Sequence, residues 1–111
     1  MAGKFVLTRR DNGEFQFNLC AGNGQVILSS EGYSSHRAAL TGIESVRKNS
    51  ASDARFDRKV ASNGKPFFSL TATNGQIIGK SQLYASAATR DKGIASVKAN
   101  APAAALDDRT A

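Results

Sequence analysis

The 111-residue chain contains no tryptophan and only one cysteine, one methionine and one histidine. The single cysteine, Cys20, excludes an internal disulfide and a metal site built from several thiolates. No apolar run approaches the length of about 18 residues that a membrane-spanning helix requires. The first ten residues also lack the apolar segment of a secretory signal peptide. A lone thiol fits a reducing compartment, so we expect a cytoplasmic protein that does not contact a membrane.

Candidate catalytic side chains are few and isolated in the sequence. His36 lies beside Ser34 and Ser35, but a nucleophile and base also need a third group that orients the base. We therefore interpret His36 as a solvated residue of a first helical turn. Cys20 falls on an outward strand position, where we expect a plain small side chain. Metal-ligand clusters are absent from the pattern, so the sequence predicts no catalytic residue, no metal and no other cofactor.

The strongest feature of the sequence is an internal repeat. A shift of 51 positions aligns residues 5–50 with residues 56–101 without a gap, and 18 of these 46 positions are identical. Such a match, with turn residues at the same offsets, indicates an internal duplication. Each copy is small to bury a core alone. We therefore predict one domain over residues 1–111, made of repeats 4–50 and 55–101 that share one core about an approximate two-fold axis.

Each repeat begins with strand-like alternation. Phe15, Phe17 and Leu19 share one face by the period of two, which predicts that they point into the core. Asn-Gly pairs separate the extended runs, and this dipeptide is the strongest short signal of a β-hairpin. The sequence thus predicts a three-stranded antiparallel meander in each repeat, with type I′ turns in which both Asn and Gly adopt a positive φ.

A helix follows the meander in each repeat. Ser34 or Ser35 is placed to cap the first helix, and Ser86 occupies the corresponding position before the second. Apolar residues then recur at spacings of three and four, which is typical of an amphipathic helix. The glycines within these stripes, Gly42 and Gly93, lower helix propensity, and we interpret them as sites where the backbone lies close to the sheet.

The βββα pattern, found twice, predicts an α+β fold: a two-layer domain whose tandem repeats share one antiparallel sheet with both helices on one face. Over Lys4 to Asn100, the paired segments "GIESVRKN" and "GIASVKAN" and the repeated "NGQ" turns resemble the YegP-like family, small and mostly bacterial proteins of unknown function. The resemblance implies a short strand after each helix, exchanged between the halves, near Arg55–Val60 and Ala105–Arg109. Residues 102–111 are thus a C-terminal tail or a short exchanged strand. The resemblance implies no activity or cofactor.

A sheet covered by helices on one face leaves the other face to solvent or to a partner. The candidate residues for a binding surface there are Arg9, Arg10, Gln16, Asn18, Arg58, Lys59 and Phe67. An exposed Phe67 can stack a base, as in sheet-based RNA binders, and the cations can contact phosphates. The net charge of +6 favours weak attraction to polyanions, including nucleic acids. The ordinary alternative is a polar face that simply meets water.

We therefore hypothesise a small, non-enzymatic binding or interaction module that uses the open sheet face. An alternative is a small-ligand binder or enzyme with a site in the groove between the repeats, near Tyr33 and Tyr84. A third is a structural protein that acts through protein contacts alone. Because the second copy satisfies internally what a single-copy relative obtains by dimerising, we predict a monomer.

Overall fold

Each half of the chain folds into three strands and a helix, as the repeat predicts. The computed structural model describes residues 3–110. In chain order the elements are β1 (Lys4–Arg9), β2 (Phe15–Cys20), β3 (Val26–Ser29), α1 (His36–Asn49), η1 (Asp53–Arg55), β4 (Phe56–Val60), β5 (Pro66–Thr71), β6 (Ile77–Lys80), α2 (Ala87–Asn100), η2 (Ala101–Ala103) and β7 (Ala105–Asp108).

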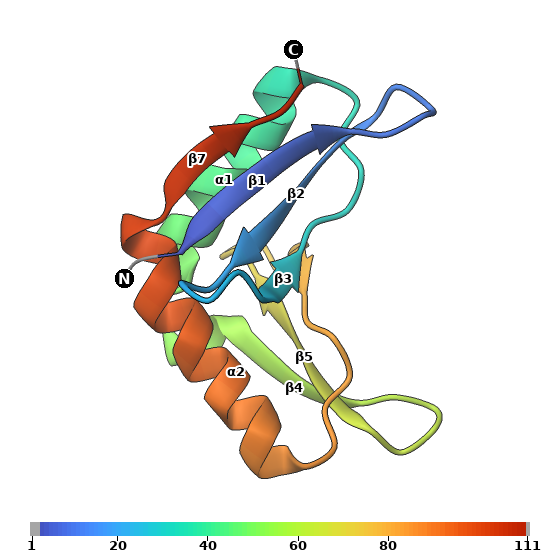
Figure 1. Ribbon diagram of the computed structural model, residues 1–111. Helices are drawn as coiled ribbons and strands as arrows, with labels where there is room; N and C mark the ends of the chain where they lie inside the picture. The colour runs from blue at the N-terminus through green and yellow to red at the C-terminus, as the bar shows by residue number, and fades with distance from the viewer. Residues whose placement is uncertain (1–2, 111) are drawn as a thin grey trace.

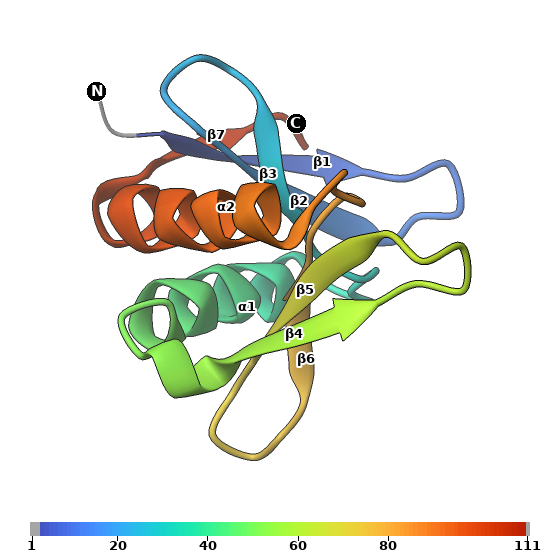
Figure 2. The same cartoon turned by 90° about the horizontal axis from the view of Figure 1, so that it is seen from below.

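All seven strands of the described residues belong to one sheet, in the order β4-β5-β6-β3-β2-β1-β7. The two repeats meet at the centre, where β3 pairs with β6 in antiparallel orientation and Ser29 lies opposite Lys80. These two residues are equivalent under the shift of 51, so the approximate two-fold axis passes between them. Helices α1 and α2 lie side by side on one face (Figures 1 and 2). The predicted two-layer α+β architecture is confirmed.

The strands after the helices differ from the expected mutual exchange. β7 does pair with β1 of the first repeat, but the two strands are parallel, with Phe5 opposite Leu106 (Figure 1). β4, in contrast, pairs only with β5 of its own repeat. The segment after α1 is the first strand of the second repeat and pairs with β5. Only β7 therefore pairs with a strand of the other repeat.

The four hairpin turns share one conformation, and it is not the expected type I′. Only the glycines, at positions 13, 24, 64 and 75, have a positive φ, between 84° and 87°, and the preceding asparagines do not. In the first turn, Gly13 N donates to Arg10 O at 2.9 Å and Arg10 N to Glu14 O at 2.7 Å. This is a three-residue loop closed by a glycine bulge. Asn12 Oδ1 accepts from Glu14 N at 3.0 Å, which explains why asparagine precedes each glycine.

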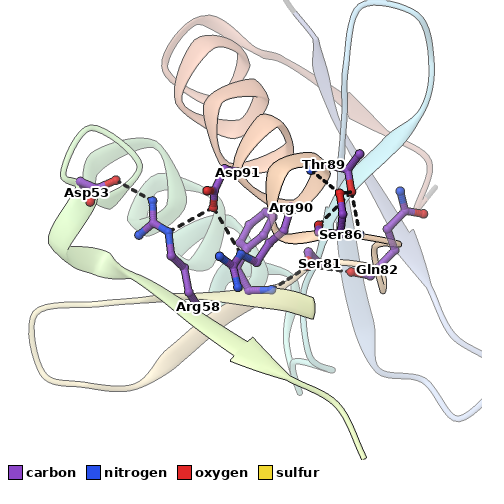
Figure 3. Close-up of polar contacts among 9 residues, drawn as sticks. Asp53, Arg58, Ser81, Gln82, Ser86, Thr89, Arg90 and Asp91 are labelled. Atoms are coloured by element: carbon purple, nitrogen blue, oxygen red, sulfur yellow. Dashed lines mark hydrogen bonds and ion pairs between the residues drawn. The ribbon is translucent and has the colours of Figure 1, made fainter. Parts of the chain in front are cut away.

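The helices begin at serine caps. Ser35 Oγ accepts from Ala38 N at 3.1 Å, so Ser35, and not Ser34, caps α1. At α2, Ser86 and Thr89 form a reciprocal capping box, visible in Figure 3. Such caps satisfy backbone N–H groups that have no partner within the helix.

The glycines in the helices lie against tyrosine rings. A Cβ atom at Gly42 would lie 2.8 Å from Tyr33 Cζ, and one at Gly93 would lie 2.7 Å from Tyr84 Cζ. Tyr33 in turn stacks on Phe17, with ring centroids 6.0 Å apart. The close packing inferred from the sequence is therefore present, but the neighbouring group is a tyrosine held on the core.

One apolar cluster joins the two repeats. It combines Phe5 and Phe17 of the first with Phe56 and Phe68 of the second, and all four rings are buried. The helices cross the boundary, since α1 contacts β5 and β6, and α2 contacts β3. Burial of apolar surface from both copies in one cluster explains why neither repeat needs a complete core of its own.

Candidate functional site

The open face of the sheet, opposite the helices, carries a hollow of about 430 Å³ over β3, β6 and the adjoining part of β5. Phe67 and Ser69 on β5, Lys59 on β4 and Lys80 on β6 all line it. Strand alternation places them there, because the intervening Phe68 and Leu70 point into the core and are fully buried. The cross-strand register sets Lys59 beside Phe67 and Lys80 beside Ser69.

The hollow combines two cations with an aromatic ring. Lys80 Nζ lies 5.2 Å from the centroid of the Phe67 ring, which is within the range of a cation–π interaction. Glu31 is the one acidic residue among the described residues that line the hollow. The positive charge of the two lysines therefore exceeds the local negative charge, and the hollow favours an anion.

A buried hydroxyl without a partner lies at the same place. Ser69 is only 1% exposed, and its Oγ has no hydrogen-bond partner. In the first repeat the equivalent residue, Asn18, has an unpartnered buried Oδ1 as well. A buried polar group costs free energy unless it is hydrogen-bonded, and such exceptions are few in folded proteins. Ser69 Oγ and Asn18 Oδ1 are thus two polar atoms, at equivalent positions of the two repeats, whose hydrogen-bonding capacity is unused.

The structure separates the seven residues that the sequence suggested for this surface. Phe67 and Lys59 come together in the hollow. Gln16 and Asn18 lie on the same face over the first repeat, outside the residues that line the hollow. Arg10 Nε donates to Gln16 Oε1 at 2.9 Å, so Arg10 supports the edge of this face near the first hairpin.

Arg9 and Arg58 do not belong to the open face, which corrects the sequence-based interpretation. Arg9 packs over the ring of Phe15, 5.4 Å from its centroid, on the helix side of the first hairpin. Arg58 forms ion pairs with Asp53 at 3.3 Å and Asp91 at 3.2 Å (Figure 3). Alternation from the buried Phe56 already predicts an inward Arg58, so this signal was available in the sequence.

Lys80 was not among the candidates, for a structural reason. Lys80 reaches Phe67 because β6 pairs with β5 and places the two side chains on one face. It also lies at the junction with β3, where it faces Ser29. The second repeat therefore has Lys59, Phe67 and Lys80 where the first has Thr8, Gln16 and Ser29. That difference between otherwise similar copies was the available signal.

His36 has a partner that the sequence could not reveal. Its Nε2 lies 2.8 Å from Asp108 Oδ2, a residue 72 positions away on β7. Hydrogen bonds from Thr110, followed by the contact with His36, lower the pKa of Asp108 to about 2. The hydroxyl of Ser35 serves the helix cap. The histidine therefore connects α1 to β7, and the neighbouring serine does not complete a nucleophilic pair with it.

Cys20 is free and buried, and it pairs with the exposed Lys4, so it lies on the face opposite Phe5 and Leu19, as the sequence predicts. The pairing of β2 with β3 shifts register between Leu19 and Cys20. The extra residue is Ile27 on β3, because the consecutive residues Leu19 and Cys20 pair with Leu28 and Val26. The period of two therefore holds to the last residue of β2 and breaks on β3.

The groove between the repeats has a volume of about 260 Å³ and is lined by Tyr33, Gly42 and the β5–β6 turn. Burial and the charge of Glu31 raise the pKa of Tyr33 above its ordinary value, so the phenol stays protonated at neutral pH. The Tyr33 ring stacks on the ring of Phe17. Residues 3–110 hold no group of three or more His, Cys, Asp or Glu residues placed to bind a metal. The groove combines the phenol of Tyr33 with polar and apolar side chains in similar measure.

No helix within residues 3–110 is both long enough and apolar enough to cross a membrane. A family model, "Domain of unknown function (DUF1508)", matches residues 11–57 and again residues 61–108. The chain is 52% identical to the UPF0339 protein YegP of Escherichia coli, over 99% of this chain and all of that protein. It is 54% identical to a UPF0339 protein of Pseudomonas aeruginosa, with the same coverage.

Two solved structures share the fold. The solution NMR structure of the Escherichia coli protein YegP, described as of unknown function, matches with a TM-score of 0.94, covering 99% of this chain and 95% of that one. A UPF0339 protein of Shewanella oneidensis, also solved by NMR, matches with a TM-score of 0.93 at 49% identity, covering 99% and 93%. With the double match to the family model, these likenesses confirm the resemblance seen in the repeat motifs: the chain belongs to the YegP-like (UPF0339, DUF1508) family, whose function is unknown.

Proposed function

We propose that the protein is a non-enzymatic binding module whose hollow on the open sheet face takes an anionic ligand with a planar ring, such as one nucleotide of single-stranded RNA or DNA. The observation that carries the proposal is the placement of Lys59, Lys80 and Phe67 around the unpartnered hydroxyl of Ser69. The ring can stack a base, and the lysines can contact phosphate.

The interaction free energies favour replacing the contact between Lys80 and Phe67 by a contact between Phe67 and a ligand. Lys80 over Phe67 contributes about 0.5–1 kcal/mol at an exposed site. A base stacked on an aromatic side chain contributes about 1–3 kcal/mol. A base that displaces Lys80 from the ring therefore gains more than it removes, and the freed ammonium group can contact a phosphate.

The test is a titration of the protein with a fluorescently labelled single-stranded oligonucleotide at several salt concentrations. Two phosphate contacts to a single strand give a slope of about −1.4 in log K against log salt. The double variant Lys59→Gln with Lys80→Gln should bind more weakly and lose that slope. Phe67→Leu should lower affinity about tenfold or more through lost stacking, with the slope unchanged.

A control of equal charge separates a site from general attraction to polyanions. Lys48 and Lys92 are exposed on the helices, on the other side of the molecule. Lys48→Gln with Lys92→Gln lowers the net charge as much as the test variant does. If both double variants weaken binding equally, or if the unaltered protein does not bind, the proposed site is wrong.

Location and assembly are parts of the same proposal. The free, buried thiol of Cys20 supports a reducing compartment, and we place the protein in the cytoplasm, which cell fractionation tests. The core shared by the two repeats supports a monomer, and light scattering at twice the mass of 11.7 kDa would contradict it.

A further inference from the structure

The two outer strands of the sheet are equivalent in sequence but differently covered. β1 of the first repeat is covered by β7, which pairs with it in parallel. Ala105 N donates to Gly3 O at 3.3 Å, and Arg109 N donates to Leu7 O at 2.8 Å. β4 is the counterpart of β1 under the shift of 51, yet it pairs only with β5 and forms the other edge of the sheet (Figure 2).

The pairing of β7 with β1 therefore indicates which kind of strand the equivalent edge of β4 can bind. Leu7 and Arg58 are equivalent positions, so the N–H and C=O of Arg58 point outward from β4, as those of Leu7 point toward β7. A strand that presents unpaired backbone groups in this way can extend its sheet by pairing with another extended segment. In the first repeat, β7 pairs in parallel with four residues of β1, Lys4 to Leu7. The equivalent residues of the second repeat are 55–58.

The side chains of β4 define which segment fits. In a parallel pair, residues in register share a face of the sheet. A segment placed as β7 is placed on β1 would set its second residue beside Phe56, its third beside Asp57, its fourth beside Arg58 and its fifth beside Lys59. Opposite charges across strands stabilise a pair and like charges destabilise it. The best segment is therefore apolar, basic, acidic and acidic at these four positions, and the exposed Val60 favours an apolar residue next.

The same register disfavours the chain's own β7 at this edge. On β4, Asp107 would face Asp57 and Arg109 would face Lys59, so two contacts would join like charges, and only Asp108 would meet an opposite charge, at Arg58. On β1, in contrast, Asp107 faces Val6 and lies 3.4 Å from Lys4 Nζ. A second copy of this chain offering β7 is thus a poor occupant of the β4 edge.

We propose that the free edge of β4 binds an extended segment of another protein, in parallel orientation, with the pattern apolar–basic–acidic–acidic–apolar. This site differs from the hollow on the open face because it uses outward backbone groups of an edge strand, although Lys59 belongs to both. The edge of β4 would thus recognise a peptide by adding it to the sheet as a further strand.

The test uses a capped synthetic peptide, Ala-Leu-Lys-Asp-Glu-Val, titrated into the isotope-labelled protein and followed by amide chemical shifts. Shifts should centre on β4 and saturate. A peptide with the sequence of residues 105–110 has the disfavoured charges and should bind at least tenfold more weakly. The proposal is wrong if both peptides bind equally or if the shifts centre elsewhere. It is also wrong if no shifts appear, and the charges of β4 then only protect an edge from aggregation.

A pair of variants separates the backbone contact from the side chain. Arg58→Pro and Arg58→Thr both remove the guanidinium group and its ion pairs, but only proline also removes the outward N–H. Proline should reduce peptide binding at least tenfold relative to threonine, while oligonucleotide binding stays equal in the two variants. If Arg58→Pro unfolds the chain, Val60→Pro against Val60→Thr provides the same comparison at the end of the strand. Peptide binding that is the same with proline as with threonine would contradict pairing at this edge.

Discussion

The junction of the two repeats depends on a leucine and a glycine at equivalent positions. Leu28 is buried, with 1% of its surface exposed, and Gly79 is its counterpart under the shift of 51. A Cβ atom at Gly79 would lie 2.6 Å from Leu28 Cδ2 and 2.7 Å from Leu28 Cγ. Two leucines therefore cannot occupy both sides of the approximate two-fold axis, and the copies have to differ here.

We expect Gly79→Ala to destabilise the protein when Leu28 is present. Whether the substitution lowers or raises the free energy of unfolding should depend on the residue at position 28. The overpacking costs about 1–3 kcal/mol, offset by about 0.5–1 kcal/mol because alanine loses less backbone freedom than glycine on folding. In a Leu28→Ala background the obstructing atoms are gone, so Gly79→Ala should stabilise by about 0.5–1 kcal/mol. The sign of the substitution is therefore predicted to reverse between the two backgrounds.

The assay is urea unfolding of the four proteins of this double-mutant cycle, followed by far-ultraviolet circular dichroism since the chain has no tryptophan. Leu28→Ala alone should cost about 2–5 kcal/mol, which a domain stable by about 5–15 kcal/mol can tolerate. A coupling energy of about 1–3 kcal/mol between the sites is expected. If Gly79→Ala has the same effect with leucine and with alanine at position 28, the described packing at the junction is wrong.

Two further predictions concern the helices and the C-terminal strand. Overpacking of Gly93→Ala against Tyr84 should cost about 1–3 kcal/mol, offset by about 1 kcal/mol of helix propensity. Tyr84→Phe removes the nearest atom, so Gly93→Ala should be more favourable in that background by thermal melting; the same effect in both backgrounds would contradict the contact. The pKa of Asp108 is lowered from 3.8 to about 2, so its contribution to stability is present above pH 3.8 and is lost as the pH falls through about 2. Asp108→Asn should remove that part of the acid dependence, and a carboxyl titration by NMR with a midpoint near 3.8 would refute the interaction with Thr110 and His36.

Local periodicity accounts for what was predictable in the fold and the site. The period of two correctly placed Phe17 and Phe68 in the core and Phe67 on the opposite face, because successive strand residues point to opposite sides. The change from a period of two to spacings of three and four after Gly32 located α1. Phe67 was identified as a surface candidate on the same grounds, whereas Lys59 was chosen for its charge together with Arg58. The turn type was wrong because the loop has three residues, and only its glycine, such as Gly13, needs a positive φ.

The sequence by itself determined the duplication, the elements of each repeat and the faces that they bury, since these follow from neighbouring residues and from a fixed offset along the chain. Only the tertiary structure decided that Lys80 reaches Phe67, that His36 meets Asp108, and that β7 covers β1 while β4 stays uncovered. Each of these depends on which strands pair and in which direction, and such pairing joins residues far apart in sequence through backbone groups that are alike in every residue.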